Sequence, residues 1–258
     1  MSIYLLIGGL GLVTGFFSGL LGIGGGIVMA PLLLYVPPFF GLEPLSMQTV
    51  AGLTIVQGVL GCLAGGLTHK KFQFVSDKLA FYMGVTIFMA AALGGVASSF
   101  VANEVLLFIF ACLAFIAAFL MLVPVAKDCE RPEVAGLEFN RFRAVAAASG
   151  VGLFGGLVGQ GGSFILIPLM TCYVRIPTRI AIGSNLAIVF LSSIAGLLGK
   201  ALTGQIEWLL VIPIAVTVVP AACLGGLASQ KLPVASLRRI LAVLIGLAAF
   251  RMWGSLFF

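Results

Sequence analysis

Charged residues are missing from long stretches of this sequence, and their absence narrows the choice of fold sharply. Residues 1–42 contain no Asp, Glu, Lys or Arg. Only 9% of the 258 residues are charged, whereas a soluble domain carries about 25%. A transmembrane helix needs about 20 consecutive apolar residues, and unbroken apolar runs do not fit the alternating pattern of a membrane β-barrel. The sequence therefore predicts an all-α polytopic membrane protein, with the lipid bilayer as its surroundings.

Two of the apolar segments are too long for a single crossing. The uncharged segments are 1–42, 44–68, 79–103, 105–126, 144–174, 180–199, 208–230 and a last one at 233–253. The first and fifth are also too short for two full crossings, and each holds a cluster of glycines. Irregular backbone at membrane depth is tolerated only where it is buried in protein or lines a cavity. We therefore expect each to be a hairpin that enters the membrane, breaks at its glycines and returns.

The same two segments reveal an internal duplication. With a shift of 137 residues, six residues of the first segment meet identical residues of the fifth, namely Gly19, Leu20, Gly22, Gly24, Gly25 and Pro31 against Gly156, Leu157, Gly159, Gly161, Gly162 and Pro168. Later, "LGGVAS" at 93–98 meets "LGGLAS" at 224–229. Because order and spacing persist over most of both halves, we interpret the chain as two repeats.

The positions of Lys and Arg indicate how the halves are oriented. If both long segments are hairpins, every Lys and Arg except Lys200 and Arg251 falls on one side of the membrane. The positive-inside rule favours this arrangement over single crossings, and it gives the halves opposite orientations, as in many secondary transporters. We expect two inverted repeats, each a glycine-broken helical hairpin followed by three transmembrane helices, at 1–125 and 143–258, joined by a cytoplasmic linker at 126–142.

A helix that begins inside the membrane would create a site for an anion. Its first backbone N–H groups have no intrahelical acceptor, and the positive end of the helix dipole lies there. Together these groups bind an anion without a charged side chain. Two inverted hairpins would direct two such ends toward one point near the midplane. The candidate substrate-binding residues at the breaks are Gly24, Gly25 and Gly26 in the first and Gln160, Gly161, Gly162 and Ser163 in the second.

Polar side chains inside two apolar segments extend the candidate site. Ser184 and Asn185 interrupt the apolar segment 180–199, and the repeat pairs Asn185 with Gln48. We therefore add Gln48, Ser184 and Asn185 to the substrate-binding candidates. Polar side chains in membrane helices also serve simply to hold helices together, so this second role stays open for each of them.

The sequence gives little support for catalysis, for a bound metal or cofactor, or for nucleic-acid binding. It has no metal-ligand spacing, nucleophile motif or phosphate-binding loop, so we expect no catalytic residue, metal or cofactor. Its basic excess is typical of cytoplasmic loops and does not indicate a nucleic-acid partner. His69 stands beside Lys70 and Lys71 at the end of a segment, where we expect a solvated or interfacial side chain rather than a proton relay.

Three stretches resemble the sulfite exporter (TauE/SafE) family of membrane transporters. They are "GLLGIGGGIVMAPLLL" near the start, its echo "GGLVGQGGSFILIPLM", and "AIGSNLAIVFLSSIAG" after the echo. The resemblance covers nearly the whole chain. It implies a secondary transporter, an exporter of small sulfur-containing anions such as sulfite or organosulfonates, in a bacterial inner membrane.

Two other functions are compatible with the same residues. One is an anion channel with a static pore. The other is a membrane enzyme that transfers sulfur through a cysteine, for which Cys172 near Arg175 is the nearest candidate. The sequence also leaves open whether the protein is a homodimer.

Overall fold

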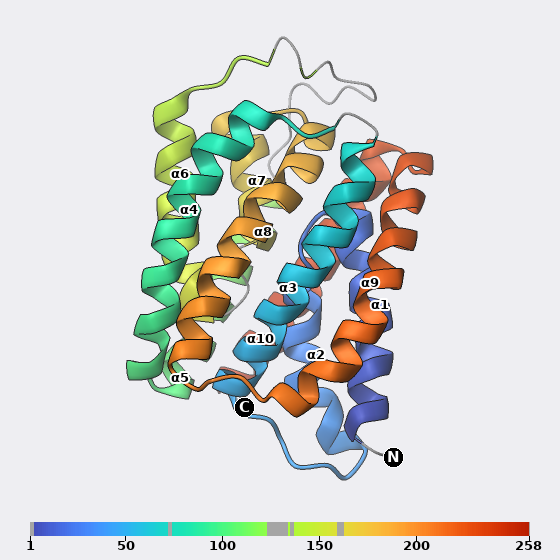
Figure 1. The fold of residues 1–258 in the computed structure, drawn as a ribbon, viewed down its shortest axis with the longest axis vertical. Helices are drawn as coiled ribbons and strands as arrows, with labels where there is room; N and C mark the ends of the chain where they lie inside the picture. The colour runs from blue at the N-terminus through green and yellow to red at the C-terminus, as the bar shows by residue number, and fades with distance from the viewer. Residues whose placement is uncertain (1–2, 72–73, 123–133, 135–136, 159–162, 258) are drawn as a thin grey trace.

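Helices form all the regular structure in the described part of the chain. The computed structural model describes residues 3–71, 74–122, 134, 137–158 and 163–257. Its long helices run roughly parallel to one another and form one bundle (Figure 1). The elements are α1 (Ile3–Leu21), α2 (Gly26–Phe39), α3 (Met47–Lys70), α4 (Asp77–Ala97), a short 3-10 turn (Ser98–Phe100), α5 (Asn103–Leu122), α6 (Arg141–Val158), α7 (Ser163–Leu169), a π turn (Met170–Val174), α8 (Thr178–Leu202), α9 (Trp208–Lys231) and α10 (Val234–Phe257).

The lengths and hydropathies of these helices suit a membrane. Among the described residues, seven helices are long and apolar enough to cross one, namely α1, α3, α4, α5, α6, α8 and α9. By contrast, α2 has 14 residues and is about 21 Å long, too short for a hydrocarbon core of about 30 Å. The prediction of an all-α polytopic membrane protein is confirmed.

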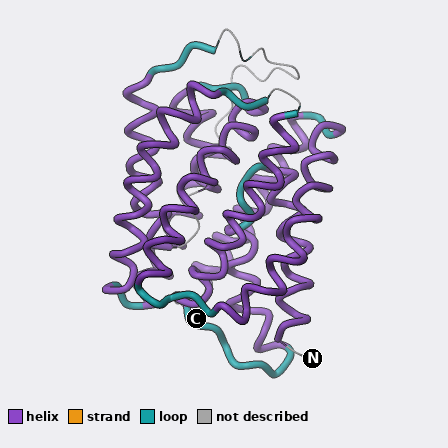
Figure 2. The backbone as a smooth tube through the Cα atoms, in the orientation of Figure 1, coloured by secondary structure: helices purple, strands orange, loops and turns teal. Residues whose placement is uncertain are grey.

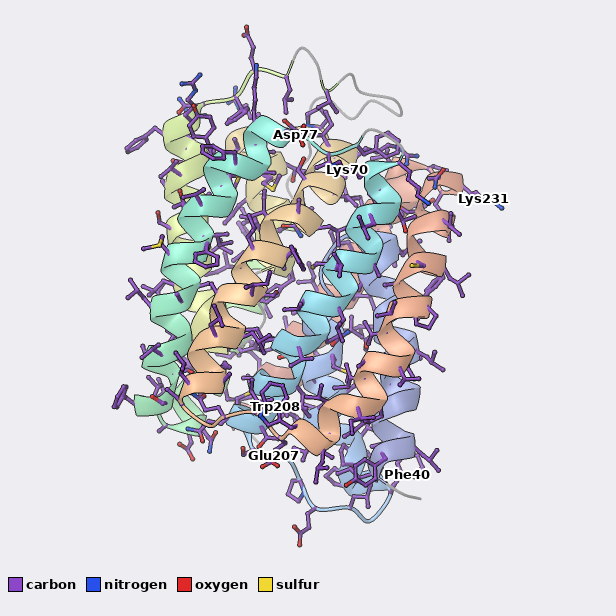
Figure 3. All side chains as sticks on the ribbon, viewed as in Figure 1. Phe40, Lys70, Asp77, Glu207, Trp208 and Lys231 are labelled. Atoms are coloured by element: carbon purple, nitrogen blue, oxygen red, sulfur yellow. The ribbon has the colours of Figure 1, made fainter. Side chains whose placement is uncertain are left out.

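The loops gather at the two ends of the bundle. Lys70, Asp77 and Lys231 lie at one end, and Phe40, Glu207 and Trp208 lie at the other (Figure 3). We call these the basic end and the acidic end. Both chain termini lie toward the acidic end (Figure 1).

The hairpin expected in the first segment is present. From the N-terminus, α1 runs toward the basic end, the chain turns at Gly22–Gly25, and α2 returns to Phe40 at the acidic end (Figures 1 and 3). A loop inside the helical body is visible in Figure 2. The repeat relation between the halves and the boundaries at 1–125 and 143–258 stay predictions, and most of the linker 126–142 lies outside the described residues.

Two helices form the centre of the bundle. In α3 and α8, 72% of the apolar window is buried, against 50% or less in the other five spans. These two helices pack against each other, and α3 also contacts α1, α2 and α9. Close packing depends on small residues, because a Cβ on Gly19 of α1 would collide with the carbonyl oxygen of Ala222 in α9. The break after α1 therefore lies beside the most buried helices.

Candidate functional site

The break between α1 and α2 is made by glycines in the left-handed backbone region. The φ angles of Gly22, Gly24 and Gly25 are 69°, 66° and 80°. Residues with a Cβ adopt this region only at a cost of about 1–2 kcal/mol each. Three such residues within four positions reverse the chain between α1 and α2. The glycine cluster in the sequence is therefore explained by the turn it must make.

The turn leaves the first N–H groups of α2 without acceptors inside the helix. The N–H groups of Val28 and Met29 donate to the carbonyl oxygen of Gly25, at 3.1 and 3.0 Å. Gly25 caps the helix without a side-chain hydrogen bond. The preceding N–H groups, on Gly26 and Ile27, cannot find an acceptor within their own helix. These two donors and the positive end of the α2 dipole lie together.

Gln57 lies directly against this helix end. It is near the middle of the 24-residue α3 and is fully buried. A Cβ on Gly25 would collide with its Nε2 atom. In the described part of the structure neither Nε2 nor Oε1 has a hydrogen-bond partner. Buried amides are nearly always hydrogen-bonded in proteins, so a missing partner, such as a ligand or water, is expected here.

Two further hydroxyl groups flank Gln57 along α3. The Oγ of Ser193, from α8, would lie 2.7 Å from a Cβ on Gly58, and the Oγ of Ser18, from α1, would lie 2.6 Å from a Cβ on Gly61. Both serines are fully buried, and neither Oγ has a partner among the described residues. The middle of α3 thus brings together three neutral polar side chains whose hydrogen-bonding capacity is unused.

The last turn of α1 is held by side chains from α3 and α8. The Nε2 of His69 lies 2.9 Å from the carbonyl oxygen of Gly19, and because a carbonyl only accepts, Nε2 carries the proton. The Nδ2 of Asn185 donates to the carbonyl oxygen of Gly22. Carbonyl groups at a helix C-terminus lack an N–H donor from their own helix, and these two side chains supply the donors. The expectation that His69 is solvated is wrong, since it is 2% exposed.

The structure separates the predicted site residues into groups. Gly24, Gly25 and Gly26 form the break and the start of α2. Asn185 is fully buried beside them and bonds to Gly22. Ser184, the neighbour of Asn185, has another partner, because its Oγ accepts from the Ser76 N–H at 2.9 Å.

Gln48 does not join this group. It lies in the first turn of α3, is only half-buried, and its backbone N–H donates to Oδ1 of Asn103 at 3.2 Å. Nine residues separate it from Gln57, about 13 Å along the helix. The polar side chain that meets the break is Gln57, which the sequence interpretation missed. The criterion of a polar residue inside an apolar segment would have selected it in 44–68.

The second break is described only in part. Gln160, Gly161 and Gly162 lie outside the described residues, and Ser163 is the first residue of α7. Phe164, the next residue, packs edge-on against Phe110 of α5 with ring centroids 5.6 Å apart. The contribution of this second break to a binding site stays a prediction.

Catalytic and metal chemistry finds no cluster to support it in the described part of the chain. No group of three or more His, Cys, Asp or Glu that could hold a metal occurs among the residues searched. The Sγ of Cys172 donates to the carbonyl oxygen of Leu120 at 3.3 Å, a packing contact between helices. What the chain does bring together is a set of neutral hydrogen-bonding groups inside a membrane-spanning bundle.

A multi-pass helical bundle with a broken helix that begins among buried polar groups has the architecture of a membrane transporter. Comparison with known proteins gives the family. The chain belongs to the sulfite exporter TauE/SafE family, whose model matches residues 7–252.

Similar proteins occur in bacteria and archaea under the name "probable membrane transporter protein". YunE of Bacillus subtilis is 26% identical, over 92% of this chain and 93% of its own length. A protein of Haemophilus influenzae is 27% identical, over 94% of this chain and 95% of its own. One from Methanocaldococcus jannaschii is 24% identical, over 92% and 90%. No solved structure matches the chain.

Proposed function

We propose that this protein is a secondary transporter that exports small sulfur-containing anions, such as sulfite or organosulfonates, across the plasma membrane. The proposal rests on one observation, the position of the start of α2 beside Gln57. There, the Gly26 and Ile27 N–H groups have no acceptor within α2, and the neighbouring Gly25 lies against the buried Gln57 amide, which has no partner among the described residues. The family description supplies the substrate class.

The charge of the substrate follows from the donors. A helix N-terminus favours negative charge, and the Gln57 Nε2 group adds a neutral donor. An anion held by neutral donors alone binds weakly enough to be released, as transport requires. A multivalent phosphate would usually recruit Arg or Lys, whereas the atoms nearest to a Cβ on Gly25 belong to Gln57 and Thr14. A small anion with a compact charge suits such a site best.

The second half would complete the site. By the duplication, Gln160, Gly161, Gly162 and Ser163 would approach the same anion from the opposite direction. Alternating access would then arise from the movement of one half against the other around the anion. A membrane potential that is negative inside assists anion export, because one charge moved across 100 mV gains about 2.3 kcal/mol.

Transport by purified protein in vesicles tests the proposal. We expect proteoliposomes to take up sulfite, thiosulfate or sulfoacetate with a rate that saturates as the substrate concentration rises. Substrate on the far side should accelerate the exchange. Single-channel currents that increase linearly with voltage would favour a static pore instead, and a failure of every anion to cross would contradict the proposal.

A cysteine-dependent sulfur-transfer reaction makes a different prediction. A variant with all five cysteines replaced should keep its full transport rate if the protein is a transporter of this kind. Loss of flux on replacement of Cys172 alone, with the other four cysteines present, would favour the enzyme. The variant Cys112→Ser, a half-buried cysteine on α5, is the control.

A further inference from the structure

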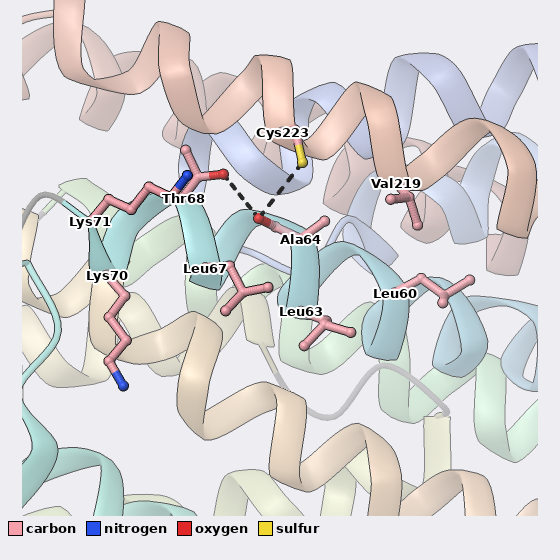
Figure 4. A pocket seen from close by; sticks show the side chains of 9 residues that line it. All are labelled: Leu60, Leu63, Ala64, Leu67, Thr68, Lys70, Lys71, Val219 and Cys223. Carbon is pink, nitrogen blue, oxygen red and sulfur yellow. Dashed lines mark hydrogen bonds between the residues drawn. The ribbon is translucent and has the colours of Figure 1, made fainter.

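A lateral groove of about 600 Å³ runs between α3 and α9. Figure 4 shows Leu60 toward one end and the two lysines at the other. Leu63 and Leu67 are exposed along it. The groove is lined by Leu60, Leu63, Ala64, Leu67, Thr68, Lys70, Lys71, Val219 and Cys223.

The groove has the length of one leaflet. Leu60 is near the middle of α3, and Lys71 follows its last residue. The rise of an α-helix over this distance is about 16 Å, close to half of a hydrocarbon core of about 30 Å. The apolar part of the groove therefore extends from the bilayer centre to the interface, as one acyl chain does.

The positive charge at one end of the groove indicates which kind of molecule binds there. Lys70 and Lys71 are both exposed there, and none of the described residues that line the groove is acidic. A second copy related by a twofold axis along the membrane normal would bring its own Lys70 and Lys71 toward these lysines, and like charges repel. A phosphate group, by contrast, complements both.

We propose that this groove binds an anionic phospholipid from the leaflet at the basic end. One acyl chain lies between α3 and α9, and the headgroup phosphate interacts with Lys70 and Lys71. Basic pockets between transmembrane helices recognise anionic headgroups in this manner. The occupant is a lipid of the phosphatidylglycerol type, because its net charge is negative, whereas a phosphatidylcholine headgroup is neutral overall.

The position of the groove connects the lipid to the transport machinery. On the groove wall, the carbonyl oxygen of Ala64 in α3 accepts from Thr68 Oγ1 at 3.0 Å and from Cys223 Sγ of α9 at 4.0 Å. The helix α3 also carries Gln57, and α9 packs against α1. A lipid in the groove therefore contacts α3, which carries Gln57, and α9, which packs against α1.

Lipid retention in detergent tests this proposal without any transport substrate. The protein is purified from vesicles of equal parts phosphatidylglycerol and phosphatidylcholine, and native mass spectrometry counts the lipids that remain bound. At about 1 kcal/mol for each lysine, the pair predicts that Lys70→Gln/Lys71→Gln lowers the preference for phosphatidylglycerol about 30-fold. The control Lys78→Gln/Arg239→Gln removes two exposed charges from the same end and should keep the preference.

A second variant tests the apolar part of the groove. Val219 is 39% exposed and points into it, so Val219→Trp should fill the space and reduce retention while both lysines remain. Thermal melting of each variant confirms folding. Retention of phosphatidylglycerol at the original level in both variants would overturn the proposal, as would an equal retention of phosphatidylcholine by the unaltered protein. Dimers that lose their lipid only when they dissociate would also overturn the proposal. That result would favour a second copy of the chain at this face.

Discussion

The carboxamide of Gln57 occupies the space that a side chain on Gly25 would need. This contact joins the most buried part of α3 to the start of α2, residues that are far apart in the sequence. It explains two properties of position 25 together, because glycine is required both for the φ angle of 80° and for the approach of the amide. It also leaves a buried amide beside backbone donors that have no acceptor in their own helix, which is the arrangement on which the proposed anion site depends.

Replacement of Gly25 should abolish transport. In Gly25→Ala, the new Cβ is strained by the positive φ angle and collides with Gln57 Nε2. Gly41→Ala is the matched control, since its φ angle is 70° but nothing lies within 4 Å of its Cβ. Both variants carry the backbone cost of about 1–2 kcal/mol, and only the first disturbs the site. Flux in proteoliposomes and melting temperature are measured for each, and equal flux in the two variants would reject the glycine site.

Replacement of Gln57 separates a ligand-binding role from a structural one. In Gln57→Leu a hydrogen bond to a charged ligand is lost, worth about 1.5–3 kcal/mol, so apparent affinity should fall about 10- to 100-fold. The melting temperature should stay the same or rise, because an amide with no partner becomes an apolar side chain.

Gln48→Leu is the control for this variant. It changes the same residue type in the same helix, but at a half-buried position in the first turn. It should transport normally. If Gln57→Leu melts at a much lower temperature, or if Gln48→Leu loses as much affinity, Gln57 is not the ligand-binding amide.

Asn185 is expected to affect substrate binding indirectly, because it holds the backbone of the break in place. Asn185→Ala removes the donor to the Gly22 carbonyl, a contribution of about 0.5–1.5 kcal/mol. The apparent KM should therefore rise about 2- to 10-fold. Ser184→Ala removes instead the acceptor for the Ser76 N–H and should lower the melting temperature with little change in KM. If KM rose in Ser184→Ala and stayed unchanged in Asn185→Ala, Ser184 would be the residue that supports the break.

The two ends of the bundle should face opposite sides of the membrane. In a cysteine-free background, Lys78→Cys at the basic end should react with an impermeant maleimide only from the cytoplasmic side. Glu43→Cys and Glu207→Cys should react only from outside, because Phe40 and Glu207 lie at the opposite end (Figure 3). Reaction of Lys78→Cys and Glu43→Cys from the same side would contradict the membrane orientation.

Local features of the sequence predicted much of the fold. The charges delimit the spans, and the excess length of 1–42 with its glycines predicts the hairpin that α1 and α2 form. These features depend on residues that are neighbours in the chain. For the same reason, the polar pair Ser184 and Asn185 could be recognised as unusual within its apolar segment.

The position of Gln57 depends on contacts that no local pattern encodes. Gln48 and Gln57 are alike as polar residues in one segment, and the depth that α1 reaches before the break decides which of them meets Gly25. The repeat alignment pairs Gln48 with Asn185, but it relates positions in sequence and not the faces that the helices present. Asn185 accordingly holds the carbonyl of Gly22, a role that could not be distinguished from ligand binding beforehand.

A structure with a bound anion is the most direct test of anion binding between the start of α2 and Gln57. Selenite has the shape and charge of sulfite, and its selenium atom gives an anomalous signal in crystals of the protein. We predict an anomalous peak placed so that oxygens bonded to the selenium accept hydrogen bonds from the Gly26 N–H and from Gln57 Nε2, and its loss in Gln57→Leu. A peak elsewhere in the bundle, with only water between Gly26 and Gln57, would contradict the account.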